Sequence, residues 1–177
     1  MSKNVLNILG ISAAIISYVF YHLLGYGLIQ SVTSSLSIVW IIWLFWNNFI
    51  WKVFAGVREM PPLISGLWAG KLKSSYNENV EINITFAIKQ TFSNVFLEAK
   101  TENNSSYSIC AKWVSSPLQP RLFYLYQTKP LGGQFSKENV PQYGGGCLYF
   151  KTINTLTINY WTTSGTIGII TLQKMLS

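Results

Sequence analysis

A run of 25 residues without a fixed charge, from Val5 to Ile29, constrains this chain more than any other feature. A helix rises about 1.5 Å per residue, so such a run is longer than the roughly 30 Å hydrocarbon core of a bilayer. A signal peptide is the alternative, but it would need an apolar region of only about 7–15 residues and a small-residue cleavage site. A second apolar run follows and is interrupted only by Lys52 near its end. The sequence therefore predicts two membrane spans, at about residues 5–29 and 36–54.

The segment between the two spans, Gln30–Ser35, is short and uncharged, which predicts that the spans form a helical hairpin connected there. Lys3 precedes the first span, and Lys52 and Arg58 close the second. Basic residues that flank membrane spans stay in the cytoplasm. We therefore expect a multi-pass membrane protein, with both the N-terminus and the C-terminus in the cytoplasm.

Small residues recur in the first span in two pairs that are four positions apart, and two neighbouring asparagines lie in the second span. Small residues at this spacing let helices approach closely in lipid, and buried amides there need hydrogen-bond partners. The small residues could pack against the second helix of the same hairpin or against another copy of the chain. The candidate residues for membrane assembly are Gly10, Ala13, Ala14, Ser17, Asn47 and Asn48.

Beyond Pro61 and Pro62 the pattern changes, and apolar residues alternate with polar ones, most clearly from Val80 to Gln90. A period of two is typical of a strand with one buried face. Eight such segments, separated by turn-forming groups, predict an all-β, eight-stranded antiparallel, lipocalin-like barrel. A barrel of eight strands can hold one small ligand. The predicted strands are Leu67–Ser74, Val80–Gln90, Asn94–Thr101, Tyr107–Val114, Arg121–Thr128, Gly146–Lys151, Thr155–Thr163 and Thr166–Leu172.

The predicted domains are thus a transmembrane hairpin, residues 1–59, and a cytoplasmic barrel, residues 60–177. Charged residues make up only 11% of the chain, Asp is absent and His22 is the one histidine. A chain of this composition cannot supply a Ser-His-Asp triad or a His/Cys/Asp metal cluster. We therefore expect no enzyme, no metal site and no cofactor. The barrel segment carries ten basic and five acidic residues. That balance suits a phosphate-bearing ligand or an anionic membrane surface, whereas the scattered lysines do not suit long nucleic acid.

Several short motifs accompany the hairpin and the eight strands in a fixed order. They are Gly66-Leu67-Trp68 at the first strand, Ser105–Ser108 at the fourth, Leu122–Tyr126 in the fifth, Tyr160–Thr162 in the seventh and Thr166–Gly168 in the eighth. Over nearly the whole chain this arrangement resembles the CBASS effector family called CD-NTase-associated protein 15. Two positions depart from the family pattern: Tyr143-Gly144-Gly145 stands where His-x-Gly is common, and Ser164 stands where an arginine is common.

The resemblance implies a barrel that senses a cyclic dinucleotide, which a partner CD-NTase cyclase makes during phage infection. It further implies that the protein oligomerises and disrupts the inner membrane, so that the infected cell dies. The alternative is a non-toxic, membrane-tethered, lipocalin-like binder of a small apolar ligand. This alternative explains the barrel and Gly66-Leu67-Trp68, but it explains neither the second span nor the serine and threonine motifs.

Residues at positions i and i+2 of a strand share a face, so the family-like motifs give pairs of candidate ligand-binding residues. Hydroxyl donors and aromatic faces suit a ligand with two phosphates and two flat bases. The tyrosine pair could instead be plain barrel core, and the serine pair could be solvated. The predicted ligand-binding residues are Ser106, Ser108, Tyr124, Tyr126, Tyr160, Thr162, Thr166 and, as a phosphate partner, Arg121.

Overall fold

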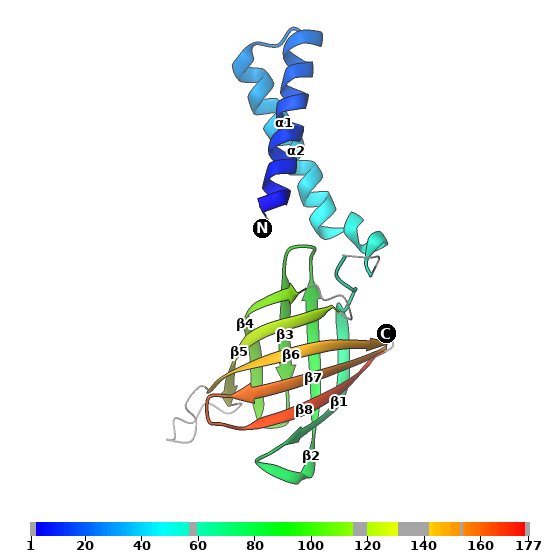
Figure 1. Cartoon of the computed structure of the whole chain (residues 1–177), viewed down its shortest axis with the longest axis vertical. Helices are drawn as coiled ribbons and strands as arrows, with labels where there is room; N and C mark the ends of the chain where they lie inside the picture. The colour runs from blue at the N-terminus through cyan, green and yellow to red at the C-terminus, as the bar shows by residue number, and fades with distance from the viewer. Residues whose placement is uncertain (1–2, 57–59, 115–119, 131–141, 153, 176–177) are drawn as a thin grey trace. The chain divides into compact units, whose positions relative to one another are not determined.

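The computed structural model describes residues 3–56, 60–114, 120–130, 142–152 and 154–175. The chain divides into two compact units, Met1–Phe54 and Ala55–Ser177. The first unit is a helical hairpin and the second is a closed eight-stranded antiparallel barrel (Figure 1). The predicted fold, two N-terminal helices followed by such a barrel, is confirmed.

The hairpin consists of α1 (Lys3–Leu23) and α2 (Leu28–Asn48), and a 3₁₀ helix, η1 (Ile50–Phe54), follows them. The predicted connector at Gln30–Ser35 is wrong, because this segment forms the first turns of α2. The chain turns earlier, at residues 24–27, where Gly25 adopts a φ of +67° that favours glycine. The hydroxyls of Ser31 and Ser35 donate to carbonyls of the preceding turn, at Gly27 and Val32, so these polar residues do not end the helix.

In the part of the chain that the structure describes, α2 is long and apolar enough to cross a membrane, by length and composition only. Only 17% of the most apolar 18-residue stretch of α2 is buried, whereas the core helix of a soluble protein is mostly buried. The apolar part of α1, Gly10–Leu23, is shorter than a full span. A second crossing by α1 stays a prediction.

The small residues of α1 divide between two environments. Ala13 is buried, as are Ser31 and Ser35 of α2, and α1 and α2 contact each other. Gly10 and Ala14 are exposed, and a methyl group built on Gly10 would meet no other atom within 4 Å. Ala13 thus packs within the hairpin, while the face that carries Gly10 and Ala14 is open.

The two asparagines of α2 are half-buried near its C-terminal end. The Asn48 side chain donates to the Leu44 carbonyl of its own helix at 2.8 Å. One donor of the Asn48 amide is therefore satisfied without a neighbouring helix.

The barrel strands follow one another around the closed sheet, and each pairs with its neighbours in sequence. All eight predicted strands are present with similar boundaries. They are β1 (Gly66–Ser74), β2 (Asn77–Gln90), β3 (Val95–Lys100), β4 (Asn104–Val114), β5 (Arg121–Pro130), β6 (Gln142–Thr152), β7 (Thr155–Thr162) and β8 (Ile167–Lys174).

The largest difference from prediction is at β6, which begins at Gln142 rather than at Gly146. The glycine run Gly144–Gly146 lies inside the strand instead of forming a turn. A Cβ atom on Gly145 would lie 2.2 Å from the Trp161 indole. Glycine is needed here because an aromatic ring from the neighbouring strand covers the backbone, a pairing that favours glycine within a strand.

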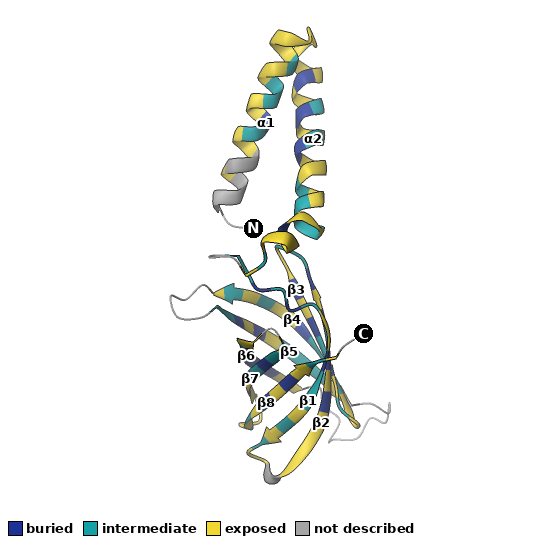
Figure 2. Cartoon of the chain, turned by 90° about the vertical axis from the view of Figure 1, so that its right-hand side faces the viewer, coloured by how far each residue is buried: buried dark blue, intermediate teal, exposed yellow. Residues whose placement is uncertain are grey.

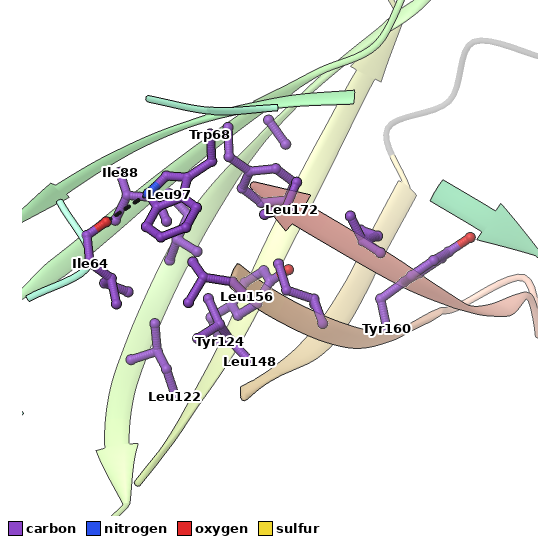
Figure 3. Packing of buried hydrophobic residues seen from close by; sticks show 14 of the residues in the cluster. Ile64, Trp68, Ile88, Leu97, Leu122, Tyr124, Leu148, Leu156, Tyr160 and Leu172 are labelled. Carbon is purple, nitrogen blue, oxygen red and sulfur yellow. Dashed lines mark hydrogen bonds between the residues drawn. The ribbon is translucent and has the colours of Figure 1, made fainter. Parts of the chain in front are cut away.

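One end of the barrel is filled by a solid apolar core around Trp68, Leu122, Leu148 and Leu156, none of which is exposed to solvent (Figure 3). The Trp68 indole donates to the Ile64 carbonyl at 2.9 Å. Two further hydrogen bonds tie the segment before β1 to buried Gln90, whose side chain donates to the Pro62 carbonyl and accepts from the Ile64 amide. Among the described residues, buried apolar side chains fill this end, which we call the closed end.

Candidate functional site

A cavity of about 180 Å³ occupies the other half of the barrel interior, which we call the open end. Inward-facing residues of β2, β3 and β8 form its apolar floor, chiefly Ile84, Phe86, Leu97 and Ile170. Serine, threonine and tyrosine side chains of β4, β5 and β7 form the rest of the wall. The closed end gives the barrel rigidity, and the open end gives it room for a ligand.

Six of the eight predicted ligand-binding residues line this cavity. The structure therefore brings together the strand faces that the motifs indicated, although the residues come from three different strands. These six are Ser106, Ser108, Tyr124, Tyr126, Tyr160 and Thr162.

Thr166 does not line the cavity, but it contacts Thr162 across the turn between β7 and β8. The Thr166 amide donates to Thr162 Oγ1 at 3.1 Å, and the Thr162 amide donates to the Thr166 carbonyl at 2.9 Å. Ser164, the residue in the place of a family arginine, lies 2.8 Å from Thr162 Oγ1 through its own hydroxyl. Thr166 is thus positioned to orient Thr162 rather than to contact a ligand in the cavity.

Arg121 is not among the residues that line the cavity, and its role as a phosphate partner stays a prediction. Residues 122, 124, 126 and 128 of β5 turn inward, so position 121 turns outward. Its guanidinium stacks on the Tyr149 ring at 5.2 Å from the ring centroid. Lys112, opposite Phe123 on the outer face of β4, is exposed, whereas Arg121 is half-buried.

The serine side chains of the cavity have local hydrogen bonds that hold them in place. Ser108 Oγ accepts from the Leu97 amide at 2.9 Å, next to the bulge between Ser108 and Cys110, where the β4 ladder is irregular. Ser106 Oγ lies 2.8 Å from Thr128 Oγ1. Ser108 is buried and Ser106 is half-buried, and both line the cavity.

Three tyrosine rings lie against glycines of the adjacent strand. In the register, Tyr124 is opposite Gly146, Tyr126 is opposite Gly144, and Tyr160 is opposite Gly168. A Cβ atom on any of these glycines would come within 2.5 Å of the facing tyrosine ring. The glycines let the rings lie along the barrel wall instead of across the interior, and so keep the cavity open.

The polar side chains that line the cavity are chiefly neutral hydroxyls. Burial raises the pKa of Tyr124 well above its usual range, with smaller contributions from Tyr126 and Cys147. Burial, followed by the nearby Tyr160, raises the pKa of Tyr126 to about 12. Both phenols stay protonated at neutral pH and can donate hydrogen bonds, while none of the described residues that line the cavity carries a charge.

Residues that the sequence motifs did not indicate also line the open end, notably Asn104, Thr128 and Ala99. The signal for two of them was present in the alternation itself. Asn104 lies two positions before Ser106, and Thr128 lies two positions after Tyr126, so both share the inward faces of their strands. Ala99 gave no signal, because a small apolar residue in a strand is common.

A closed barrel with a filled end and a cavity lined by aromatic and hydroxyl side chains defines a receptor-type domain for a small ligand. Residues 59–174 match the family described as "Cap15, cyclic dinucleotide receptor domain". The chain belongs to this family, which confirms the resemblance that the motifs indicated.

Two curated relatives and one solved structure are similar to this chain. CD-NTase-associated protein 15 of Staphylococcus schleiferi is 30% identical over 151 residues, which cover 84% of this chain and 81% of the relative. CD-NTase-associated protein 15 of Escherichia albertii is 24% identical over 186 residues, covering 98% and 95%. A de novo designed fluorescence-activating β-barrel matches at 12% identity with a TM-score of 0.44, covering 63% of this chain and 94% of the design.

Proposed function

We propose that this protein is an effector of a CBASS antiphage defence system whose barrel binds a cyclic dinucleotide made by a partner CD-NTase. The observation that carries the proposal is the cavity at the open end, which gathers six of the residues that the motifs indicated in a chain of the Cap15 family. Aromatic faces and hydroxyl donors are the groups that bases and sugars need for binding. The role is that of a receptor, without catalysis.

The hairpin supports a second part of the proposal, namely action at the inner membrane. Helix α2 has the length and composition of a membrane span, and large apolar side chains such as Ile11, Trp40 and Phe45 are exposed on the hairpin. We propose that both helices cross the membrane, that both termini are cytoplasmic, and that ligand binding leads to oligomers that disrupt the bilayer. The exposed pair Gly10 and Ala14 is available for contact between copies, as Ala13 is not.

A non-toxic binder of an apolar ligand is the second candidate, and the apolar floor of the cavity favours it. One experiment separates the two functions. The full chain in lipid nanodiscs is titrated by calorimetry with cyclic dinucleotides that combine adenine, guanine, cytosine and uracil, and with a fatty acid and retinol. Saturable binding of at least one cyclic dinucleotide supports the receptor, whereas binding of the apolar ligands alone supports the second candidate.

The control variant for this titration is Leu67→Ala, an exposed outward-facing position on β1. The test variant is Tyr126→Phe, which removes only a hydroxyl at the cavity. Loss of one hydrogen bond from a buried partner is expected to weaken binding by about 1–3 kcal/mol. Equal affinities of the two variants would mean that the Tyr126 hydroxyl makes no hydrogen bond to the nucleotide.

Membrane topology is tested separately by reporter fusions after Ser177. A reporter that is active only in the cytoplasm should give a signal, because the nucleotide is made there. A signal only from a periplasmic reporter would overturn the receptor as well as the topology.

A further inference from the structure

The size of the cavity restricts how much of a cyclic dinucleotide can enter the barrel. The cavity holds about 180 Å³. A dry cavity of about 150 Å³ accepts one benzene ring, and pockets that surround a whole drug-sized ligand hold about 300–1,000 Å³. The interior therefore has space for one flat ring system and not for two nucleotides.

The walls of the cavity have the shape that a flat ring needs. Tyr124 and Tyr126 lie on neighbouring positions of one face of β5, with ring centroids 5.9 Å apart. Both rings lie along the wall because Gly146 and Gly144 leave space for them. Tyr160 lies against Gly168 in the same way. Rings held against a barrel wall turn a face toward the interior, and aromatic faces stack on bases.

The charge of the cavity excludes the other parts of the ligand. None of the described lining residues is charged, and the residues toward its mouth, such as Thr101, Asn104 and Thr128, are neutral. A phosphate that enters such a site would lose its hydration without gaining a cationic partner, which is unfavourable. A base is uncharged, apolar on its faces and polar on its edges, and so matches the apolar floor and the neutral hydroxyls.

We propose that one base of the cyclic dinucleotide enters the barrel and stacks on the tyrosine-lined wall, while the second base and both phosphates stay at the mouth. This inference rests on the proposed function. It means that the two bases of the bound ligand have different surroundings. The base that enters determines affinity, and the other base contributes little.

The first test uses analogues of the panel member that binds the full chain most tightly, each lacking one base or both. At least one analogue that lacks a single base should bind within about fivefold of the parent, and the analogue without bases should bind about 10–100-fold more weakly, as expected for a lost stacked base. If each single removal weakens binding by the larger factor, both bases are held and the inference is wrong. If no panel member binds, the proposed function itself fails.

The second test fills the cavity from the protein side. Ala99 of β3 is buried and lines the cavity, so Ala99→Leu places three further carbon atoms where the base would lie. The matched control is Ala87→Leu on β2, where the outward face accommodates the same added bulk. We expect Ala99→Leu to weaken nucleotide binding about 10–100-fold and Ala87→Leu to leave it within about twofold.

Thermal unfolding of both leucine variants shows whether the barrel is intact. A folded Ala99→Leu protein that binds the dinucleotide as tightly as the parent chain would contradict base entry. If that variant does not fold, Ala99→Val provides a smaller addition at the same position. Unchanged binding by a folded Ala99→Val protein, together with large losses for each single-base removal, would likewise overturn the inference.

Discussion

The hairpin and the barrel place their apolar residues in opposite ways. In the hairpin, large apolar side chains such as Ile11, Trp40 and Phe45 are exposed, while the small polar residues Ser31 and Ser35 are buried (Figure 2). In the barrel, Trp68 and the apolar core residues that cluster with it are buried. Apolar surface is stable in water only when it is covered and is stable in lipid when it is exposed, so this difference supports the proposed membrane location of the hairpin.

The two units also satisfy their buried polar groups differently. In α2, serine hydroxyls and the Asn48 amide bond to carbonyls of their own helix. In the barrel, Gln90 and Ser108 bond to the backbone of segments that are distant in sequence. These polar groups of α2 are therefore bonded locally, whereas those of the barrel depend on contacts between strands.

The largest expected effect is on the barrel alone, from Trp68→Ala. Trp68 is fully buried at the closed end and donates to the Ile64 carbonyl, so its loss should reduce the free energy of unfolding by about 3–5 kcal/mol. Denaturant unfolding followed by tyrosine and tryptophan fluorescence measures the change. Leu67→Ala, next to it but exposed, should cost less than about 1 kcal/mol. Equal losses for the two variants would contradict the assignment of a solid closed end.

A smaller effect should separate the two faces of α1. Ala13→Leu overpacks the contact with α2 and should destabilise the hairpin by about 1–3 kcal/mol. Ala14→Leu should leave the hairpin and the nucleotide affinity unchanged but prevent close approach of a second copy. The measurement is entry of a membrane-impermeant dye into cells that contain an active cyclase.

The control for this pair is Ile15→Leu, an exposed apolar position on the same helix. Cells with Ile15→Leu should become as leaky as those with the parent chain. If Ala14→Leu cells are equally leaky, the exposed face of α1 has no part in assembly, and the small residues serve packing within one hairpin.

The stability of the barrel should depend on pH because burial raises the pKa of Tyr126. Its pKa in the folded protein is about 12, above the usual value of about 10. The folded state therefore favours the protonated phenol, and the stability linked to this group is complete below about pH 10 and is lost as pH rises toward 12. Melting temperatures across this range should fall more steeply for the parent chain than for Tyr126→Phe. Equal slopes would mean that the phenol is not buried.

The smallest expected effect is that of salt on ligand affinity. Because the described lining of the cavity is uncharged, affinity should change by less than about threefold between about 0.05 and 0.5 M salt. The natural comparison is Arg121→Gln, which removes a cation from the outer face and should leave both the affinity and its salt dependence as they are. A steep salt dependence that this substitution abolishes would restore Arg121 as a phosphate partner.

Much of the fold could be predicted from the sequence, because alternation with a period of two is a local signal and eight such segments have few ways to close. The hairpin connector could not be placed by polarity, since a serine in a helix can bond to its own backbone, as Ser31 and Ser35 do. The start of β6 was missed because a glycine run usually marks a turn. Here it marks the places where Tyr124, Tyr126 and Trp161 lie over the backbone.

Part of the candidate site could be predicted because the period-two alternation also indicates which residues share a strand face. Shared strand faces brought together the pairs of β4, β5 and β7, and the same alternation, applied to β5, places Arg121 on the outer face. The size of the cavity could not be predicted, because it depends on how the tyrosine rings lie against Gly144, Gly146 and Gly168. That arrangement is set by the register between strands, which the motifs alone do not specify.

Amide hydrogen exchange of the full chain in nanodiscs, with and without the cyclic dinucleotide that binds most tightly, tests most directly that the open end of the barrel is the receptor site. Ligand binding should slow exchange in segments that line the cavity, 97–108, 124–128 and 158–162. Exchange at the closed end, around Ile64 and Trp68, should stay slow in both states, because side chains already fill that end. Slower exchange only on segments outside the cavity, or no change under saturating nucleotide, would contradict the account.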